Sequence, residues 1–448
     1  MKRFQIEQSD EEFYTSHSGN ALVGLSLNRF TSLASSLAKA VPSDDVISHA
    51  DVIKSYCGLL SQAKSDFVAI EQYRGDDFFR ESLGNEHIPS EATMRQRMDE
   101  HAAAFLPMVS WASVEFLQKI KASVTPLDTG HVSVDIDGFV MDNSDSRKEK
   151  VSRTYRQVDG YLYLPAYIGL EGLLVNGHLL PGSQHPQKEY LSFLRETHAR
   201  IRQICQKKLL YRKDSAHDSL DNRIELAGYA KTDYIIKWNP RKQDGQQWWR
   251  QGLEAGGVVT SPRPGKREVL FSVKEKETVT NEDGVAKTFS FRRVMRVIER
   301  TIDKKGQPIL LPEYELEGWW TSLALADEKI IELYKGHGLC EQFHAEIKTD
   351  MDLERLPSGK FATNQLVMAC GALVYNILRF IGQVSLVTSK GIIRHEAKRR
   401  RIKTVIQELI YFAGRLIASG RRLKLRFSRH VTAHAEAFAA IYRRLAYG

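Results

Sequence analysis

The feature that most constrains the fold of this chain is a change of hydrophobic period at residues 131–139. In the run HVSVDIDGF, every second residue from Val132 onward is apolar, which is the period of a β-strand with one buried face. Asp135 and Asp137 lie on the other face, and Gly138 lets the chain turn as the strand ends. The sequence therefore predicts a strand with carboxylates at its C-terminal end.

Strand and helix patterns alternate after this run. Two further strands joined by a Glu-Gly turn are followed by an amphipathic helix, a strand, a helix and a strand. The turn makes the first three strands antiparallel neighbours, and the whole order predicts a mixed α/β fold with a central sheet. The segments are 160–170, 172–182, 187–205, 207–214, 219–230 and 232–239.

Segments of other pattern flank and interrupt this core. Residues 21–100 have the three- and four-residue apolar spacing of helices, whereas 240–324 holds β-type runs joined by turn signals. We expect an α/β protein with a mixed-sheet core, an inserted β-subdomain and helical N- and C-terminal regions. The expected boundaries are 1–125 for the N-terminal region, 126–239 and 326–387 for the core, 240–325 for the insertion, and 388–448 for the basic, helical C-terminal region.

The run from 334 to 348 is a helix candidate with two distinct faces. At about 100° per residue, an arc of roughly 60° carries the polar residues Tyr334, His337, Glu341 and Lys348. A different arc carries the apolar residues Leu333, Cys340, Phe343 and Ile347. One face is suited to packing, and the other is free for chemistry.

Composition indicates a globular, cytoplasmic protein with a polyanionic partner. The 448 residues are 42% hydrophobic, which allows more than one core, and the formal net charge is +9. The N-terminus lacks the apolar core of a signal peptide, and we expect no membrane partner. The four cysteines are far apart and form no CxxC pair, which argues against disulfides and a structural zinc site.

Three carboxylates stand where they could converge. Asp137 and Asp214 each follow a predicted strand, and Glu341 lies on the helix after the sheet. Like charges a few Å apart need compensation, so a shared pocket would bind a divalent cation. Oxygen ligands favour Mg²⁺ or Mn²⁺ over Zn²⁺, and two such ions about 3.5 to 4 Å apart promote in-line displacement at phosphorus. Two alternatives stay open: Asp214 could serve only as a helix cap, and Asp135 could replace Asp137.

The spacing Tyr334-x2-His337-x3-Glu341-x6-Lys348 resembles the Y-x2-R-x3-E-x6-K signature of bacterial insertion-sequence DDE transposases. Their first two acidic ligands lie in strand-end motifs that are similar to VDIDGF and LLYRKDS in this chain. The runs YRGDDFFRESLGNEHIPSEATMRQRMDEH and LPSGKFATNQLVMACGALVYNILR most resemble the 1380 family of insertion sequences. The likeness extends from about Leu59 to the basic tail.

The resemblance implies a ribonuclease-H-like core and a cut-and-paste recombinase. Such an enzyme binds terminal inverted repeats of double-stranded DNA, cleaves at the element ends and joins the 3′-OH to target DNA. It would act as a homodimer, because two ends must be paired, in the bacterial cytoplasm on the nucleoid. By matching motif, Asp137, Asp214 and Glu341 would hold two Mg²⁺ ions. Tyr334 and Lys348 would contact phosphates beside the scissile bond.

One signature position departs from the family. His337 stands where the motif has Arg, so a permanently charged phosphate clamp is replaced by a group that is mostly neutral near pH 7. We expect either weaker DNA binding through His337 or a clamp supplied by another residue, such as Lys335.

Further DNA contacts are expected outside the signature. Ser90 is a predicted N-cap of a helix with Arg95 and Arg97 one turn inside, in a helix-turn-helix-like unit. In related transposases an aromatic side chain of the insertion stacks on a flipped base, which is worth roughly 1 to 3 kcal/mol. Trp320 is the candidate for this role, with core packing as the alternative. The basic segment after the core offers phosphate contacts from Lys398, Arg399, Arg400 and Arg401.

Two other functions would use the same residues. A ribonuclease-H-like nuclease without strand transfer needs the same carboxylates, and its failure to join pre-cut ends would distinguish it. A non-catalytic DNA-binding protein derived from a transposase needs only the basic surfaces, and the His337 departure is compatible with it. Salt-sensitive DNA binding without cleavage under any metal ion would indicate that second alternative.

Overall fold

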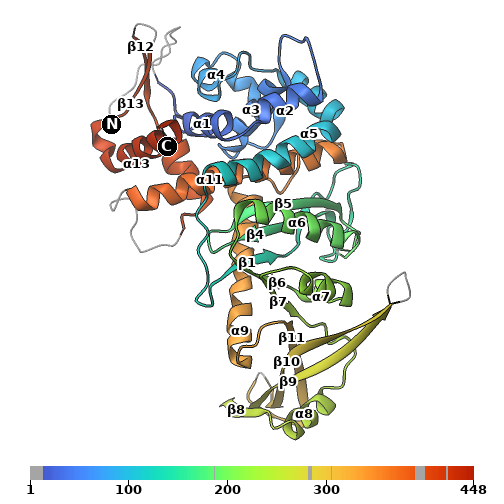
Figure 1. Cartoon of the computed structure of the whole chain (residues 1–448). Helices are drawn as coiled ribbons and strands as arrows, with labels where there is room; N and C mark the ends of the chain where they lie inside the picture. The colour runs from blue at the N-terminus through green and yellow to red at the C-terminus, as the bar shows by residue number, and fades with distance from the viewer. Residues whose placement is uncertain are drawn as a thin grey trace.

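A mixed sheet extends from the middle of the molecule to the end opposite the N-terminal helices (Figure 1). The computed structural model describes residues 14–185, 187–280, 285–303, 305–388, 399–419 and 422–447. Within these ranges, eleven strands form one sheet with the main order β2-β4-β1-β6-β7-β11-β10-β9-β8, and β3 and β5 pair with β4 (Figure 1). The predicted mixed α/β class is therefore confirmed. The strands are β1 (His131–Ile136), β2 (Phe139–Asp142), β3 (Ser152–Arg153), β4 (Asp159–Ile168), β5 (Leu173–Pro181), β6 (Lys208–Lys213), β7 (Thr232–Lys237), β8 (Val258–Arg263), β9 (Lys266–Thr280), β10 (Ala286–Ile302) and β11 (Pro308–Thr321).

Strands β1 and β2 form a single bent strand along β4. Ile136, the last residue of β1, and Phe139, the first residue of β2, both pair with β4. Only Asp137 and Gly138 lie between them, at the break in the ladder. Strand β5 pairs antiparallel with the other edge of β4, so the predicted antiparallel order of the first three strands is confirmed.

Strands β6 and β7 extend the sheet in parallel with β1. The register pairs Ile136 with Lys213, and these are the last residues of β1 and β6. Asp137 and Asp214 therefore leave the sheet side by side, because the C-terminal ends of parallel strands meet at one edge.

The expected β-insertion continues the core sheet. Strand β11 pairs with β10 and also with β7, where Trp319 lies opposite Lys237. Figure 1 shows the long β9–β10 hairpin reaching away from the rest of the molecule. The insertion also contains a helix, α8 (Gly245–Glu254), which the sequence patterns did not predict. Its N-terminus is capped by Asp244, whose side chain accepts from the Gln246 N–H at 2.9 Å.

Two long helices connect the N-terminal helices to the sheet. Helices α5 (Glu91–Lys119) and α11 (Phe361–Thr388) lie side by side, and one continuous apolar core includes residues of both (Figure 1). The stretch Phe361–Val387 is long and apolar enough to cross a membrane, but 89% of its most apolar window is buried inside the protein, which is typical of a core helix. The other helices are α1 (Asn20–Phe30), α2 (Leu33–Ala40), α3 (His49–Leu60), α4 (Asp77–Leu83), α6 (Tyr190–Ile204), α7 (Leu220–Ala227), α9 (Asp327–Lys335), α10 (Cys340–Ala345), α12 (Ile402–Val405) and α13 (Thr432–Tyr447).

The basic C-terminal region is not wholly helical, so the expected helix is wrong for part of it. Strands β12 (Arg415–Ser419) and β13 (Arg422–Arg426) form a hairpin before α13. The run RLKLRF alternates basic and apolar residues, which is a strand pattern. Leu425 and Phe427 pack against the apolar core, whereas the basic residues between the apolar ones stay exposed.

Substitution of a glycine in the β4–β5 turn measures how tightly the sheet packs against α10. Gly172 has a left-handed backbone (φ 66°), and a Cβ there would lie 2.3 Å from the Phe343 ring, whereas Gly130 (φ 77°) would place a Cβ in open space. We expect Gly172→Ala to lower the free energy of unfolding by about 1–3 kcal/mol more than Gly130→Ala, because only the first overpacks the core. Urea denaturation followed by circular dichroism measures both variants. Equal losses would mean that Phe343 moves aside at no cost.

Candidate metal and nucleic-acid site

Three carboxylates meet in one cavity of about 330 Å³. Asp137 comes from the end of β1, Asp214 from the end of β6 and Glu341 from the first turn of α10. Tyr334 and His337 line the same cavity. The structure thus brings together the three acids that were predicted from separate sequence motifs.

Burial raises the pKa of two of the acids in this cavity, Asp137 and Asp214. Burial raises the pKa of Asp137 to about 6, and the carboxylates of Asp214 and Glu341 act in the same direction. Burial also raises the pKa of Asp214. An oxygen-lined pocket that disfavours its own negative charge is suited to a divalent cation, which compensates that charge. These three side chains fit Mg²⁺ or Mn²⁺.

The two aspartates keep oxygen atoms available for a ligand. Asp214 Oδ1 accepts from the Ala216 N–H at 3.2 Å and caps the 3₁₀ turn Ser215–His217. The capping role that the sequence left open is therefore present. The His217 backbone also interacts with the Asp214 carboxyl. Within the described ranges, no side-chain hydrogen bond involves either carboxylate oxygen of Asp137. Capping and metal binding are compatible.

Asp135 is committed to a buried ion pair, which removes it as a substitute for Asp137. The Arg212 guanidinium donates from Nε to Oδ1 at 2.7 Å and from Nη2 to Oδ2 at 2.6 Å. Both residues are only 2% exposed. Burial alone would raise the pKa of Asp135, but Arg212 and His337 outweigh burial and lower it. Asp135 therefore stays ionised beneath the cavity.

Arg212 belongs to this site but was not among the residues expected from the sequence, although the strand pattern contains a signal for it. Asp135 and Arg212 each stand two residues before a strand-end aspartate, on the face that carries that aspartate. The two are direct partners in the parallel register of β1 and β6. A charged residue inside an otherwise buried strand requires a partner, and the matching positions in the two strands supply it.

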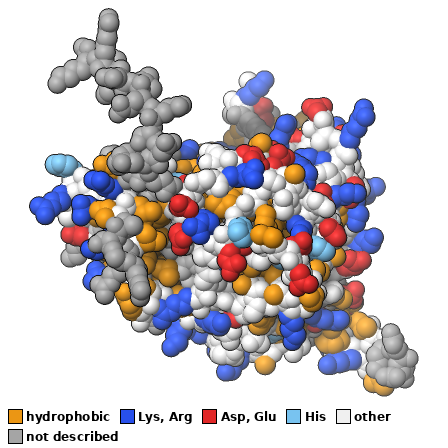
Figure 2. Space-filling model, turned by 90° about the horizontal axis from the view of Figure 1, so that it is seen from above, with side chains coloured by type: hydrophobic (Ala, Val, Ile, Leu, Met, Phe, Trp, Pro, Cys, Tyr) orange, Lys and Arg blue, Asp and Glu red, His pale blue; other side chains and the backbone are white. Residues whose placement is uncertain are grey.

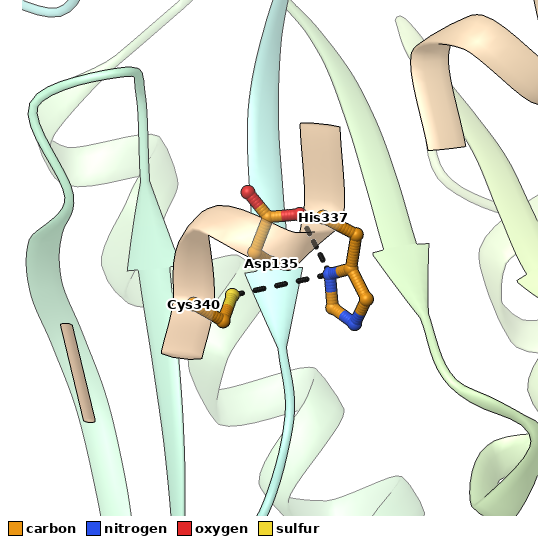
Figure 3. Close-up of side chains that lie close together, drawn as sticks. All are labelled: Asp135, His337 and Cys340. Atoms are coloured by element: carbon orange, nitrogen blue, oxygen red, sulfur yellow. Dashed lines mark hydrogen bonds and ion pairs between the residues drawn. The ribbon is translucent and has the colours of Figure 1, made fainter. Parts of the chain in front are cut away.

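His337 is buried against Asp135 and does not extend into solvent. Its Nδ1 lies 3.0 Å from Asp135 Oδ1, and Cys340 Sγ lies 3.9 Å from the same nitrogen (Figure 3). The side chain is 8% exposed. These three groups could geometrically surround a metal ion. However, Arg212 occupies both carboxylate oxygens, and burial raises the pKa of the Cys340 thiol, so the donor set does not fit a metal.

Arg212 also explains why the expected helix over 334–348 is interrupted. Its Nη1 donates to the Leu333 carbonyl at 2.9 Å, the carbonyl that would accept from the His337 N–H in a regular α-helix. A Cβ on Gly336 would lie 2.3 Å from that Nη1, so glycine leaves room for the guanidinium. The chain is α-helical to Lys335, 3₁₀ over Gly336–Leu339, α-helical in α10 and a π-turn over Glu346–Asp350. The predicted apolar face is buried nevertheless.

The two outer signature residues have different environments. Tyr334 is half-buried in the cavity wall, and burial raises the pKa of its phenol, which therefore stays protonated and can donate a hydrogen bond. Lys348 does not line the cavity. Its Nζ donates to the Val140 carbonyl at 3.0 Å and pairs with Glu354 at 2.7 Å.

Trp320 lies in the packed interior and not in the cavity. It is 3% exposed, and the guanidinium groups of Arg223 and Arg293 lie 3.9 and 4.6 Å from its ring centroid. This arrangement corresponds to the core-packing alternative, since a base would have to displace an arginine to reach the ring. Trp319, one residue earlier and on the opposite face of β11, lines the cavity instead.

The arginines expected to contact DNA are held by acidic residues of the chain itself. On the face seen in Figure 2, basic and acidic side chains are interspersed. Lys398 lies outside the described residues. The observed pairs are Arg95 with Glu91, Arg97 with Asp45, Arg399 with Glu346, Arg400 with Glu408, and Arg401 with Asp350. The last three attach the basic segment to the π-turn and to its own helix.

Removing one charge of the buried Asp135–Arg212 pair should destabilise the folded protein. We expect Arg212→Met to lower the free energy of unfolding by about 3–5 kcal/mol, because it leaves the buried Asp135 carboxylate with His337 in place of a permanently charged partner. The double variant Asp135→Leu with Arg212→Met removes both charges and should recover most of the loss. Arg195→Met is the control, since Arg195 is 62% exposed in its pair with Glu225 and should cost at most about 1 kcal/mol. Guanidinium unfolding curves measure all three, and a double variant as unstable as Arg212→Met would contradict the explanation.

The raised pKa of Asp137 predicts a pH-dependent stability. The folded protein keeps this proton up to about pH 6, whereas the unfolded chain releases it near the ordinary value of 3.8. In EDTA the wild type should therefore lose stability as the pH rises from about 4 to 6. Asp137→Asn has no proton to lose, so its advantage over the wild type should grow by up to about 3 kcal/mol between pH 4 and pH 7, and by less where solvent screens the charge. Thermal unfolding at the two pH values tests this, and an unchanged difference would contradict it.

Comparison with known proteins assigns the chain to a family. The family model described as "Transposase DDE domain group 1" matches residues 13–447. No curated protein matches the sequence. Among solved structures, the chain is similar to a piggyBac transposase in a synaptic complex with hairpin DNA, with 10% identity, coverage of 90% of this chain and 83% of that chain, and a TM-score of 0.42. Because the family model covers nearly every residue, we conclude that the chain belongs to group 1 of the DDE transposases.

Proposed function

We propose that this transposase cleaves the ends of its own element and joins the 3′-OH to target DNA by metal-dependent phosphoryl transfer. The observation that supports this most is the convergence of Asp137, Asp214 and Glu341 in one cavity. Membership of the DDE family implies a DNA substrate and a divalent metal ion. A decayed, non-catalytic relative would have no need to keep three acids together in a site where burial, and then repulsion by the other two, raises the pKa of Asp137.

We infer a ribonuclease-H-like core. The strand order β5-β4-β1-β6-β7 supports it, with three antiparallel strands followed by two strands parallel to β1. The insertion between β7 and α9, ahead of the helix that carries Glu341, agrees with the arrangement in insertion-sequence transposases of the Y-R-E-K type. Within that group, we propose the 1380 family of insertion sequences as the nearest relatives.

Each residue in or near the cavity would have a separate role in this reaction. Asp137, Asp214 and Glu341 would hold two Mg²⁺ ions, which activate the attacking oxygen and stabilise the leaving oxygen when bound. Tyr334 would donate a hydrogen bond from its protonated phenol to a phosphate oxygen of the bound DNA. His337, held by Asp135, would present only its cavity-facing edge to that phosphate. Lys348 would contact DNA only after releasing Val140 and Glu354.

We also propose that the protein acts on DNA as a homodimer. Transfer of an element requires both of its ends in one complex, and each end needs one cavity. Concerted joining of two ends, in place of independent joining of single ends, would support this arrangement.

Glu341→Gln tests the proposed reaction. The substitution keeps the size of the side chain but removes a metal-binding charge, so we expect strand cleavage at the element's ends to fall by at least about 10³-fold in Mg²⁺. Glu332→Gln is the control, because Glu332 lies on the solvent face of the preceding helix α9 and should keep wild-type activity. The assay uses end-labelled DNA from the flanks of the coding region. Equal cleavage by wild type and Glu341→Gln would refute the assignment.

Supplying pre-cut ends separates transposition from simple hydrolysis. The wild type should convert them to joined products with a target plasmid. A protein that cleaves ends and never joins them would be a nuclease of the same fold.

A further inference from the structure

A lysine lies at the same level across the strands as the first two acids, in one row of laterally adjacent residues. The last residue of β6 pairs with Ile236 of β7 on one side and with the last residue of β1 on the other. The next positions along the three strands are Asp137, Asp214 and Lys237. Neighbouring strands lie about 4.8 Å apart, so the Lys237 backbone is about 5 Å from that of Asp214 and about 10 Å from that of Asp137. Residues of one row point to the same face of the sheet.

The Lys237 side chain shares the cavity of the acids. It is half-buried and lines this cavity together with Asp214 and Glu341. Its charge acts against burial on the pKa of Asp214, which indicates that the two groups are close. On its other side, Lys237 lies opposite Trp319 of β11, which also lines the cavity. Because β7 is paired with β6 on one side and with β11 on the other, the position of the Lys237 Cα is fixed.

Within the described residues Lys237 makes no ion pair or side-chain hydrogen bond, although the Asp214 carboxyl is close enough to interact with its charge. Arg296, another cation of the cavity, binds Glu317 through Nε at 2.7 Å. Lys335 has no ion pair either in this part of the chain, but it is exposed at the C-terminal end of α9. No hydrogen bond or ion pair involves Lys237 Nζ. A half-buried ammonium that donates no side-chain hydrogen bond inside the protein keeps its donors free for an anionic ligand.

On the basis of the proposed function, we propose that Lys237 binds a non-bridging oxygen of the DNA phosphate that reacts in this cavity. The negative charge on a transferring phosphoryl group is spread over its oxygens, and a fixed cation beside them stabilises the transition state. An ammonium supplies a compact charge without demanding one orientation. Since Asp214 lies between Lys237 and Asp137 in the row, Lys237 would contact the phosphate from the side opposite Asp137.

The test compares Lys237→Met with Lys208→Met. Lys208 is the exposed first residue of β6. Its substitution removes the same charge at the N-terminal end of this strand, whereas the acids and Lys237 lie at the C-terminal ends of their strands. We expect Lys237→Met to reduce end cleavage about 10²-fold. It should also reduce the slope of log Kd against log salt for element-end DNA by about one. Lys208→Met should cleave like the wild type, and Lys237→Arg should restore the salt slope and part of the cleavage.

Two other results with these variants would overturn the proposal, and a third would concern the proposed reaction. Cleavage and salt slope in Lys237→Met equal to those in Lys208→Met would overturn the proposal. Equal losses in Lys237→Arg and Lys237→Met, with a lower melting temperature, would indicate a structural role and also overturn it. If the wild type cleaves no DNA, the proposed reaction fails, and the salt slope alone then decides whether Lys237 binds a phosphate.

Discussion

The catalytic end of the sheet depends on one buried ion pair. Asp135 and Arg212 are direct partners in adjacent parallel strands, and each compensates the charge of the other in a place that water does not reach. The same guanidinium holds the Leu333 carbonyl at the break before α10. Either charge alone would cost several kcal/mol in this interior. Strands β1 and β6 and the end of helix α9, which leads into α10 and Glu341, are thus joined by a single side chain.

Much of the site could be predicted because it rests on local patterns. A two-residue period locates a strand, and an aspartate directly after it lies at the C-terminal edge of the sheet, as Asp137 and Asp214 do. The helical period likewise separated the buried face containing Phe343 from the face containing Glu341. Because the helix break at Gly336 is short, it left this division intact. What such patterns do not contain is the strand order, and only the order puts Lys237 in the row of the acids.

The features that escaped prediction depend on partners far away in the sequence. The arginines at 399–401 have the composition of a DNA-binding stretch, yet Arg399 binds Glu346 and Arg401 binds Asp350. Trp319 and Trp320 are adjacent in sequence and both buried, but they lie on opposite faces of β11, and only Trp319 lines the cavity of the acids. In the C-terminal hairpin, the alternation of basic and apolar residues forms strands, because Leu425 and Phe427 find an apolar core to pack against that the sequence pattern does not show.

The continuity of the insertion with the core has an evolutionary consequence. Strand β7 is covered on one side by β6 and on the other by β11, which closes the insertion. Excision of the insertion would leave β7 as an open edge strand, with unpaired N–H and C=O groups beside the cavity, and such edges recruit strands from other chains. The insertion can therefore change in length or sequence at its distal hairpin, but a descendant that discarded it entirely would have to find another cover for that edge or aggregate through it.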